Sequence, residues 1–447
     1  MTNARILSAS WSERPVTMRL PFQFGNTEVR ETAEAWCAVE IEVDGRRVRG
    51  ASAQLMVPRW FDKRPGLSNA ETIDALRATV HAAVDAAPDR RGSALAITRE
   101  LRQDVIRAES ALPALAAGFG PALVEMALVD ALCRAAGLPF WKAAAADLFG
   151  LVDGRPEDLT ARALTASLSA IRAPRRITVR HTVGFDAPLT RDAVGPDAPR
   201  DGLPVSLEEV IARTGVSAFK IKLKGDPQAD LARLRAIAGL LEPLADYTAT
   251  LDANEQYAPA TFGDFLAVLD EDPALGRLRR AVRFVEQPFA RETALDMEVG
   301  APLPLVIDES DDREDAFARA LERGWAGTSI KSCKGVLRAL LNKARAEAAG
   351  AILSGEDLTC QPGLCWQQDT AMAAACGVRD IERNGHHFGG GMQGSSEAET
   401  SARLELHPDI YTRIDGRPFL RFDSGEVRIG SLDRPGFGHV FAAGTID

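Results

Sequence analysis

The sequence predicts an α/β protein in which a parallel (β/α)8 barrel of the TIM type is joined to a smaller α+β domain. Three observations lead to this fold class. Eight short apolar segments in the second part of the chain end in polar residues, and each precedes a helical stretch rich in Ala, Leu and Arg. Polar residues at seven of these ends, positions 222, 252, 286, 308, 331, 356 and 382, are separated by roughly the length of one β–α unit. The first and last parts of the chain lack this rhythm.

The composition is typical of a soluble globular protein with more than one core, since the chain has 447 residues. The formal charge is 53 − 63 = −10 and no basic block occurs, which argues against a nucleic-acid surface. The N-terminal segment MTNARILSASWSERP lacks the regions of a signal peptide, and the longest apolar run is interrupted by charges. Six scattered cysteines fit reduced thiols. We therefore expect a cytoplasmic protein without a membrane or nucleic-acid partner.

The N-terminal domain is expected to span residues 1–174. Its segment WCAVEIEVDGRRVRG predicts a β-hairpin with Asp44-Gly45 as the turn. From about Ala70 to Leu148 apolar residues recur at helical spacing, and the Pro/Arg-rich IRAPRRI marks the boundary. Mixed strands and helices of this kind predict an α+β domain.

The barrel is expected over residues 175–400, and the predicted strands are read directly from the chain. In order they are ITVRHTVG, SAFKIKLK, YTATLDANE, VRFVEQP, LPLVIDES, GTSIKSC, GAILSGED and VRDIERNG.

The C-terminal segment, residues 401–447, is rich in turns and strands and resembles the N-terminal domain more than the barrel. We expect it to return and pack against that domain.

Three carboxylates follow consecutive predicted strands, in LDAN, VEQP and IDES. Because the carboxyl ends of barrel strands meet at one mouth, Asp252, Glu286 and Asp308 should lie side by side. They would repel one another unless a cation lies between them, and hard oxygen ligands suit Mg²⁺, with Mn²⁺ as an alternative. A zinc site is disfavoured because Cys360 and Cys365 have no second ligand pair nearby in the sequence.

Lysines flank this predicted site. In SAFKIKLK, Lys220, Lys222 and Lys224 alternate with apolar residues and therefore share one face of a strand. Such a row also occurs on guarded edge strands, but a barrel has no edge and its mouth gives the row a place. Lys331 ends the sixth predicted strand, on the other side of the carboxylates. A lysine beside another cation has a lowered pKa and can act as a base, so proton abstraction next to a carboxylate, through an enediolate, is the predicted chemistry.

The motifs KIK, DAN, EQP, DES and IKSCKG resemble the enolase superfamily, in its mandelate racemase and muconate lactonizing enzyme branch, and most closely the muconate lactonizing/dipeptide epimerase type. PFQFG, VEMALVDALCRAAGLPFW and LDRPGFGHV extend the resemblance over the whole chain. It implies a modified enolase barrel whose capping domain is formed by the N-terminal part and the C-terminal tail.

The resemblance also implies roles for individual residues. Asp252, Glu286 and Asp308 would bind Mg²⁺. Lys222 would be the base on one face, with Lys220 lowering its pKa and contacting the substrate carboxylate. Lys331 would be the acid or base on the opposite face.

Further positions are predicted to contact the substrate or to support the ligands. They follow ligand residues, end later strands, lie in the loop after the eighth strand, or lie in capping loops: Asn254, Glu309, Glu356, Glu382, His386, His387, Phe24, Met56 and Trp60. Two departures from the family pattern are present. Lys334-Gly335-Val336 stands where a Gly-Gly pair is frequent, and IERNGHHFGGGM lacks the aspartate pair that dipeptide epimerases carry there.

The expected function is racemisation or epimerisation of a small carboxylic acid, or its cycloisomerisation, because bases on two faces can remove and return a proton. A sugar-acid dehydratase is the alternative within the superfamily. A barrel without activity that serves binding or assembly is the alternative from another class, and retention of all three carboxylates and both lysines argues against it. Homo-oligomers are common in the family, so we expect one here.

Overall fold

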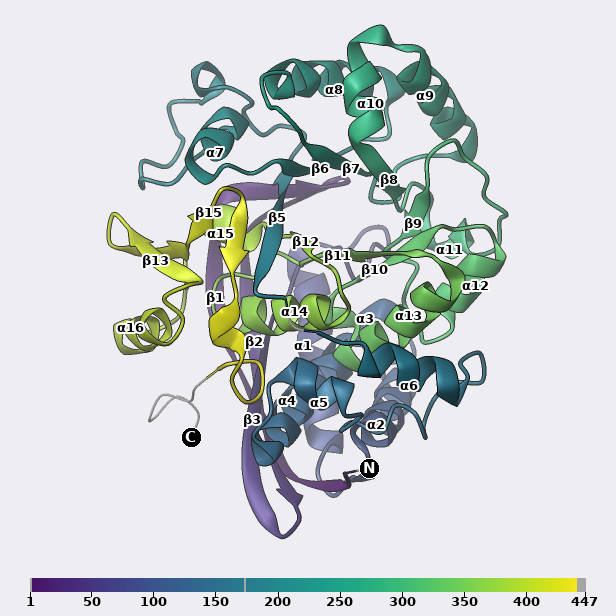
Figure 1. The fold of residues 1–447 in the computed structure, drawn as a ribbon, viewed down its shortest axis with the longest axis vertical. Helices are drawn as coiled ribbons and strands as arrows, with labels where there is room; N and C mark the ends of the chain where they lie inside the picture. The colour runs from purple at the N-terminus through teal and green to yellow at the C-terminus, as the bar shows by residue number, and fades with distance from the viewer. Residues whose placement is uncertain (1, 173, 440–447) are drawn as a thin grey trace.

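A computed structural model of the chain describes residues 2–172 and 174–439. It has two main parts, a closed parallel barrel and an N-terminal sheet covered by helices, as Figure 1 shows. This confirms the predicted fold class. Residues 440–447 of the predicted C-terminal segment lie outside the described residues, as does residue 173 at the predicted domain boundary.

The N-terminal part, hereafter the cap, is a four-stranded antiparallel sheet in the order β3-β2-β1-β4. The predicted hairpin is confirmed, because Val43 pairs with Arg46 and both Asp44 and Gly45 have positive φ, as a two-residue turn between twisted strands requires. Gly50 lets helix α4 pack closely, since a Cβ there would lie 2.2 Å from Ala127 O. The strands are β1 (Ala4–Phe24), β2 (Thr27–Val43), β3 (Arg46–Leu55) and β4 (Arg91–Gly92).

The two longest helices of this part cover one face of the sheet, and the others pack around them or toward the barrel. Their bounds are α1 (Asn69–Ala86), α2 (Ala94–Ala108), α3 (Ala114–Ala117), α4 (Phe119–Ala136), α5 (Phe140–Ala145) and α6 (Ala161–Ser169). One stretch, Ala114–Ala136, is long and apolar enough to cross a membrane by length and composition, and its most apolar part is buried inside the protein. It forms the core of the cap.

The barrel consists of eight parallel strands, β5 to β12, and closes where β12 pairs with β5. Every predicted strand segment overlaps one of them, and only β5 begins outside its segment, by one residue. Their bounds are β5 (Arg176–Val183), β6 (Ala218–Lys222), β7 (Thr248–Asp252), β8 (Val282–Glu286), β9 (Leu305–Ile307), β10 (Gly327–Ile330), β11 (Ile352–Gly355) and β12 (Asp380–Glu382).

Helices follow these strands; most of them form the outer layer, and the last two pack against the cap and the C-terminal tail. They are α7 (Leu207–Thr214), α8 (Pro227–Leu241), α9 (Pro259–Glu271), α10 (Gly276–Ala281), α11 (Arg291–Ala294), α12 (Ala316–Glu322), α13 (Val336–Ala349), α14 (Leu364–Ala375), α15 (Gly385–Phe388) and α16 (Glu397–Leu406). Short 3₁₀ turns span Arg191–Ala193, Pro273–Leu275, Ser332–Lys334 and Gly430–Leu432.

The C-terminal segment joins the two parts. Its strand β16 adds to the barrel sheet antiparallel to β5, while the backbone of Gly436 bridges to Pro139 in the cap. The tail strands are β13 (Tyr411–Ile414), β14 (Arg417–Leu420), β15 (Phe422–Asp423) and β16 (Glu426–Arg428).

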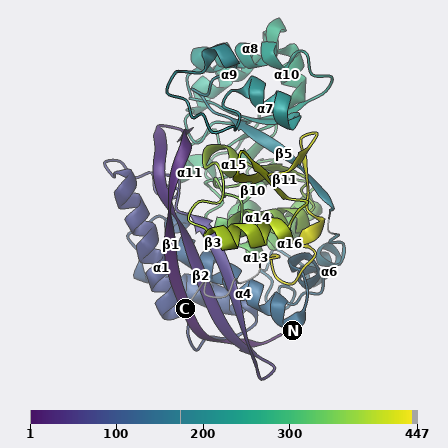
Figure 2. The ribbon, with the colours of Figure 1, turned by 90° about the vertical axis from the view of Figure 1, so that its left-hand side faces the viewer.

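The long β1–β2 hairpin brings the cap to the barrel mouth, and Figure 2 shows these strands rising along the barrel from the cap below it. At the tip, Asn26 Nδ2 donates to Gln256 Oε1 at 3.3 Å, in the loop after β7. The mouth is therefore enclosed by both parts of the chain.

Candidate active site

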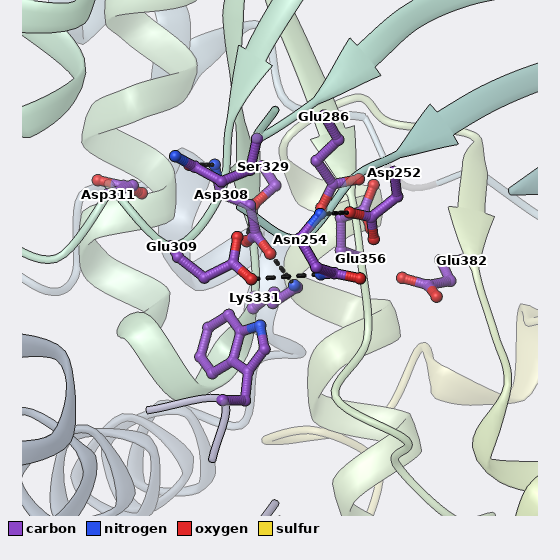
Figure 3. Close-up of polar contacts among 12 residues, drawn as sticks. Asp252, Asn254, Glu286, Asp308, Glu309, Asp311, Ser329, Lys331, Glu356 and Glu382 are labelled. Atoms are coloured by element: carbon purple, nitrogen blue, oxygen red, sulfur yellow. Dashed lines mark hydrogen bonds and ion pairs between the residues drawn. The ribbon is translucent and has the colours of Figure 1, made fainter. Parts of the chain in front are cut away.

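Three carboxylates lie at the ends of neighbouring strands β7, β8 and β9, as predicted. Asp252 and Glu286 are direct partners across the sheet, and Asp308 follows β9. All three are fully buried. Figure 3 shows their side chains turned toward a common centre at the mouth.

Lys220 extends into the middle of this acidic cluster. Its Nζ lies 3.0 Å from Asp252 Oδ2, 2.8 Å from Glu286 Oε2 and 3.0 Å from Glu382 Oε2, and it also pairs with Glu356. Burial lowers the pKa of Lys220, but the carboxylates outweigh burial and hold its pKa well above the usual range. Its ammonium group is therefore an internal counter-ion.

Lys222 and Lys331 each bind one of the three carboxylates from a different side. Lys222 Nζ donates to Asp252 Oδ2 at 2.6 Å and to Asn254 Oδ1 at 2.9 Å. Lys331 Nζ donates to Asp308 Oδ2 at 2.5 Å. Strands β6 and β10 are four positions apart in a closed barrel of eight, so the two lysines enter the mouth from opposite walls.

The pKa of Lys331 is raised, whereas a lowered lysine pKa was expected at this site from the sequence. Burial lowers it, but the adjacent Asp308 carboxylate outweighs burial, so the pKa of Lys331 lies above its usual range. The lowering was expected from neighbouring cations and a metal ion, whereas in the structure the charge closest to Lys331 is the Asp308 carboxylate. A cation bound to the Asp308 carboxylate would weaken its attraction for the Lys331 ammonium and so remove the cause of the raised pKa.

The cap completes the environment of Lys331. Its ammonium lies 4.5 Å from the centre of the Trp60 ring, within the range of a cation–π contact. Arg291, at the start of α11, donates to Trp60 O at 2.9 Å and to Phe61 O at 3.3 Å. The same guanidinium forms two hydrogen bonds of 2.9 Å with the Glu255 carboxylate. The main chain beside Trp60 is thus fixed to the barrel.

Two further lysines contact the site but were not predicted to belong to it. Lys63, in the cap, donates to Asn254 O at 3.0 Å and Glu309 Oε1 at 3.3 Å. Lys334 Nζ lies 3.0 Å from Asp308 Oδ1. The three-residue spacing of Lys331 and Lys334 around a 3₁₀ turn was a usable signal, whereas nothing around Lys63 in the sequence indicates its place.

The three carboxylates fit a hard divalent cation by their chemistry. Both carboxylate oxygens of Glu286 are buried and have no hydrogen-bond partner, since Lys220 approaches one of them without hydrogen-bond alignment. Burial and the neighbouring Asp252 carboxylate raise the pKa of Glu286 well above its usual range. A cation would relieve this repulsion. Within residues 2–172 and 174–439, no three acidic, His or Cys side chains are grouped tightly enough to hold an ion without movement, and lysine ammonium groups lie among these three.

A small cavity of about 20 Å³ lies between this cluster and the cap. Such a volume holds about one water molecule, so a substrate requires the cap segment to move. The predicted residues that line the cavity are Lys220, Lys222, Lys331, Phe24, Trp60, Asn254 and Glu382. Lining residues that were not predicted as contacts are Phe22, Val57, Asp357, Leu358, Thr359 and Asn384. A more open groove of about 450 Å³, between α9 and residues 297–302, contains none of the clustered charges.

Five predicted contacts lie outside the cavity lining. Met56 is fully buried in the cap, and Glu356 pairs with Lys220 and Arg180 below the mouth. Glu309 contacts Lys63.

The two histidines complete this set. His386 packs against Phe419 and Phe422, and His387 against His181 and Phe388. Burial lowers the pKa of both histidines well below the usual range, which favours their neutral form. Their position fits a packing role.

Comparison with known proteins places this geometry in context. A family model described as enolase C-terminal domain-like matches residues 203–442. No curated protein sequence matches the chain.

Many solved structures share the fold over nearly the whole chain. The L-Ala-D/L-Glu epimerase from Bacillus subtilis has 19% identity and a TM-score of 0.62, covering 97% of this chain and 98% of that one. The dipeptide epimerase from Methylococcus capsulatus, complexed with Mg and the dipeptide L-Arg-D-Lys, has 20% identity and a TM-score of 0.59, covering 98% and 100%. The 2-chloromuconate cycloisomerase from Rhodococcus opacus has 16% identity and a TM-score of 0.61, covering 97% and 96%. These structures confirm the fold expected from the motifs, and the family model confirms the expected superfamily.

Proposed function

Because the chain belongs to the enolase C-terminal domain-like family, we propose that it removes the proton α to the carboxylate of a small carboxylic acid and returns it, as a racemase or epimerase. The observation that carries this proposal is the placement of Lys222 and Lys331 on opposite walls of one buried cavity, beside three clustered carboxylates. A donor and an acceptor on two faces of one carbon are what inversion at that carbon requires.

Asp252, Glu286 and Asp308 would hold Mg²⁺, the ion present with the Methylococcus capsulatus epimerase. When bound, the ion would supply positive charge near the substrate carboxylate while negative charge develops on its oxygens. The orphaned oxygens of Glu286 support this assignment.

In the forward direction, Lys222 takes the α-proton on one face and Lys331 delivers a proton on the other. For this, Lys222 has to be neutral and Lys331 charged, and the reverse reaction exchanges the two states. Trp60 lies over Lys331 and forms part of the cavity wall on its side. Asn254 orients the Lys222 ammonium through a hydrogen bond of 2.9 Å.

Proton exchange followed by NMR in D₂O tests this function. The full chain with Mg²⁺ is incubated with dipeptides, N-acyl amino acids, hydroxyproline-like acids and sugar acids. We expect exchange of an α-proton that requires Mg²⁺. In Lys222→Met the exchange should be lost for the stereoisomer whose α-proton faces Lys222. In Lys224→Met, whose lysine is exposed beside the same strand, it should persist for both stereoisomers. Exchange of both stereoisomers in Lys222→Met, or exchange that does not depend on Mg²⁺, would contradict the proposal. Appearance of a 2-keto acid in the same spectra would select dehydration instead.

A further inference from the structure

One wall of the cavity carries polar atoms that have no partner. Thr359 follows β11 and Asn384 follows β12, and both line the cavity. The side chains are buried, with residue exposures of 2% and 1%. Among the described residues, Thr359 Oγ1 and Asn384 Oδ1 are without a hydrogen-bond partner. An unpaired buried polar atom costs about 1–3 kcal/mol, so two on one cavity wall need an explanation.

The two loops that form this wall are fixed to each other. The Asp357 carboxylate joins its two loops, because Oδ1 accepts from Thr359 N at 2.9 Å and Oδ2 from Asn384 N at 3.3 Å. The backbones of the loops touch, since a Cβ on Gly385 would lie 2.0 Å from Cys360 O. Thr359 adopts φ +57°, a conformation that costs a β-branched residue about 1–3 kcal/mol. Strain and lost hydrogen bonds coincide at the same place.

The chemistry of the unpaired atoms defines their partner. Asn384 Nδ2 donates to Glu382 Oε1 at 3.1 Å, and this fixes the amide orientation because a carboxylate accepts. Oδ1 of the same amide is therefore an acceptor. The Thr359 hydroxyl can accept as well as donate. A group with an N–H or O–H satisfies both atoms, whereas a hydrocarbon leaves both unpaired.

We propose that Thr359 and Asn384, held by Asp357, form a specificity subsite for a hydrogen-bond donor, N–H or O–H, carried by the carboxylic acid substrate. The proposal rests on the proposed function for the identity of that substrate. A substrate with an amide N–H and one with a hydroxyl share this chemistry, and the test below separates them. A site built to pair a donor rejects an analogue without it, because the polar atoms of the site then stay unpaired.

Two pairs of acids serve as probes, and each pair compares an acid that carries the donor with one that lacks it. Binding to the Mg²⁺-loaded full chain is measured by calorimetry. N-acetylalanine is compared with N-acetyl-N-methylalanine, in which the probe without the donor is larger. Lactate is compared with propionate, and in this pair the probe without the donor is the smaller one. Size therefore cannot account for a preference in both pairs. We expect the wild type to bind the donor member about tenfold or more tightly in at least one pair, and the pair that responds identifies amide or hydroxyl as the donor.

The variant Thr359→Val removes the hydroxyl at nearly constant shape, and Thr359→Gly removes it while favouring the positive φ. We expect both to reduce the preference to about threefold or less. Thr98→Val is the matched control, since Thr98 Oγ1 is also buried and unpartnered but lies in α2, away from the cavity.

The proposal is wrong if the two members of each pair bind equally, if no donor-bearing acid binds, or if both Thr359 variants keep the wild-type preference. A preference that disappears equally in Thr98→Val would also overturn it. Equal binding within each pair would mean that water alone pairs with the wall. Because the readout is binding, failure here is distinct from failure of the proposed function, which would appear as absence of Mg²⁺-dependent α-proton exchange.

Discussion

The β6 wall and the β10 wall of the barrel mouth each present a lysine to the cavity, but they are assembled differently. On the β6 wall, Lys222 is held by Asp252 at the end of the next strand, β7, and by Asn254 in the loop that follows it. On the β10 wall, Lys331 is held by Asp308 and covered by Trp60 of the cap. The barrel alone thus fixes one lysine, while the other depends on closure of the cap.

Lys220 deepens this contrast. It lies on the same strand as Lys222, yet its ammonium contacts four carboxylates and lies at the centre of the charge cluster. The two lysines share one face of the strand and both line the cavity, yet Lys220 is an internal counter-ion whereas Lys222 binds only Asp252 and Asn254. The sequence motif alone cannot make this distinction.

Removing either lysine should have the largest effect. Lys222→Met and Lys331→Met should each reduce inversion by about 10²–10⁴-fold, because each removes a proton donor or acceptor. Hydrogen exchange from one stereoisomer should survive in each variant, with the opposite preference in the two. The measurement is NMR in D₂O with the separate stereoisomers of an exchanging acid, and Lys224→Met is the control. Full inversion in either variant would contradict the assignment of two bases.

Removing the counter-ion should strongly affect stability. Lys220→Met leaves buried carboxylates without their cation, and losing one partner of a buried ion cluster costs about 3–5 kcal/mol. We expect a corresponding drop in the free energy of unfolding in urea, and partial recovery in Mg²⁺. The exposed pair of Lys142 with Asp433 provides the control, Lys142→Met, for which about 0–1 kcal/mol is expected. Equal losses in the two variants would show that Lys220 is not the counter-ion of the cluster.

The dependence of the β10 wall on the cap can be broken at Arg291. Arg291→Met removes the donor to Trp60 O and Phe61 O, so Trp60 should become more accessible to acrylamide. We expect kcat to fall by about tenfold, corresponding to one lost charged hydrogen bond, with a smaller change in KM. Quenching is compared with that of Trp60→Phe to isolate the Trp60 signal. Arg319→Met, which removes an exposed ion pair, is the control. If the quenching of Trp60 were unchanged in Arg291→Met, Arg291 would not determine the position of the indole.

The smallest expected effect concerns pH. Burial raises the pKa of Asp357 from 3.8 to about 8, so the folded chain binds this proton more tightly than the unfolded chain. Its contribution to stability therefore falls as pH rises from about 4 to 8. In Asp357→Asn this part of the dependence should vanish, and the variant should gain stability relative to the wild type between pH 6 and 9. Unfolding midpoints measured across that range test the sign, with the exposed Asp264→Asn as control. A parallel pH dependence in wild type and Asp357→Asn would disprove it.

The barrel and its strand-end residues could be predicted because their information is local. Each strand shows its own apolar run, and parallel closure brings all carboxyl ends to one mouth, so Asp252, Glu286, Asp308, Lys222 and Lys331 follow from the strand pattern. The same logic placed Glu382 in the lining. It failed for Glu356, which points below the mouth to Arg180, because a strand pattern gives the face of a residue but not its depth.

Contributions of the cap could be predicted only in part. Phe24 and Trp60 line the cavity, but Met56, four residues before Trp60, is buried within the cap. Loop conformation decides which side chain enters the mouth, and no periodic pattern reports it. Lys63 and Thr359 were missed for the same reason. The expected lowering of lysine pKa also required the positions of the carboxylates, which spacing does not provide.

Titration of Mg²⁺ into the full chain by calorimetry tests the central claim most directly, because the proposed chemistry requires an ion at Asp252, Glu286 and Asp308. The predicted result is one Mg²⁺ per chain, with affinity at least about tenfold weaker in Glu286→Gln and unchanged in Glu314→Gln, whose carboxylate pairs with Arg99 outside the mouth. No binding to the wild type, or equal binding in Glu286→Gln, would contradict the account.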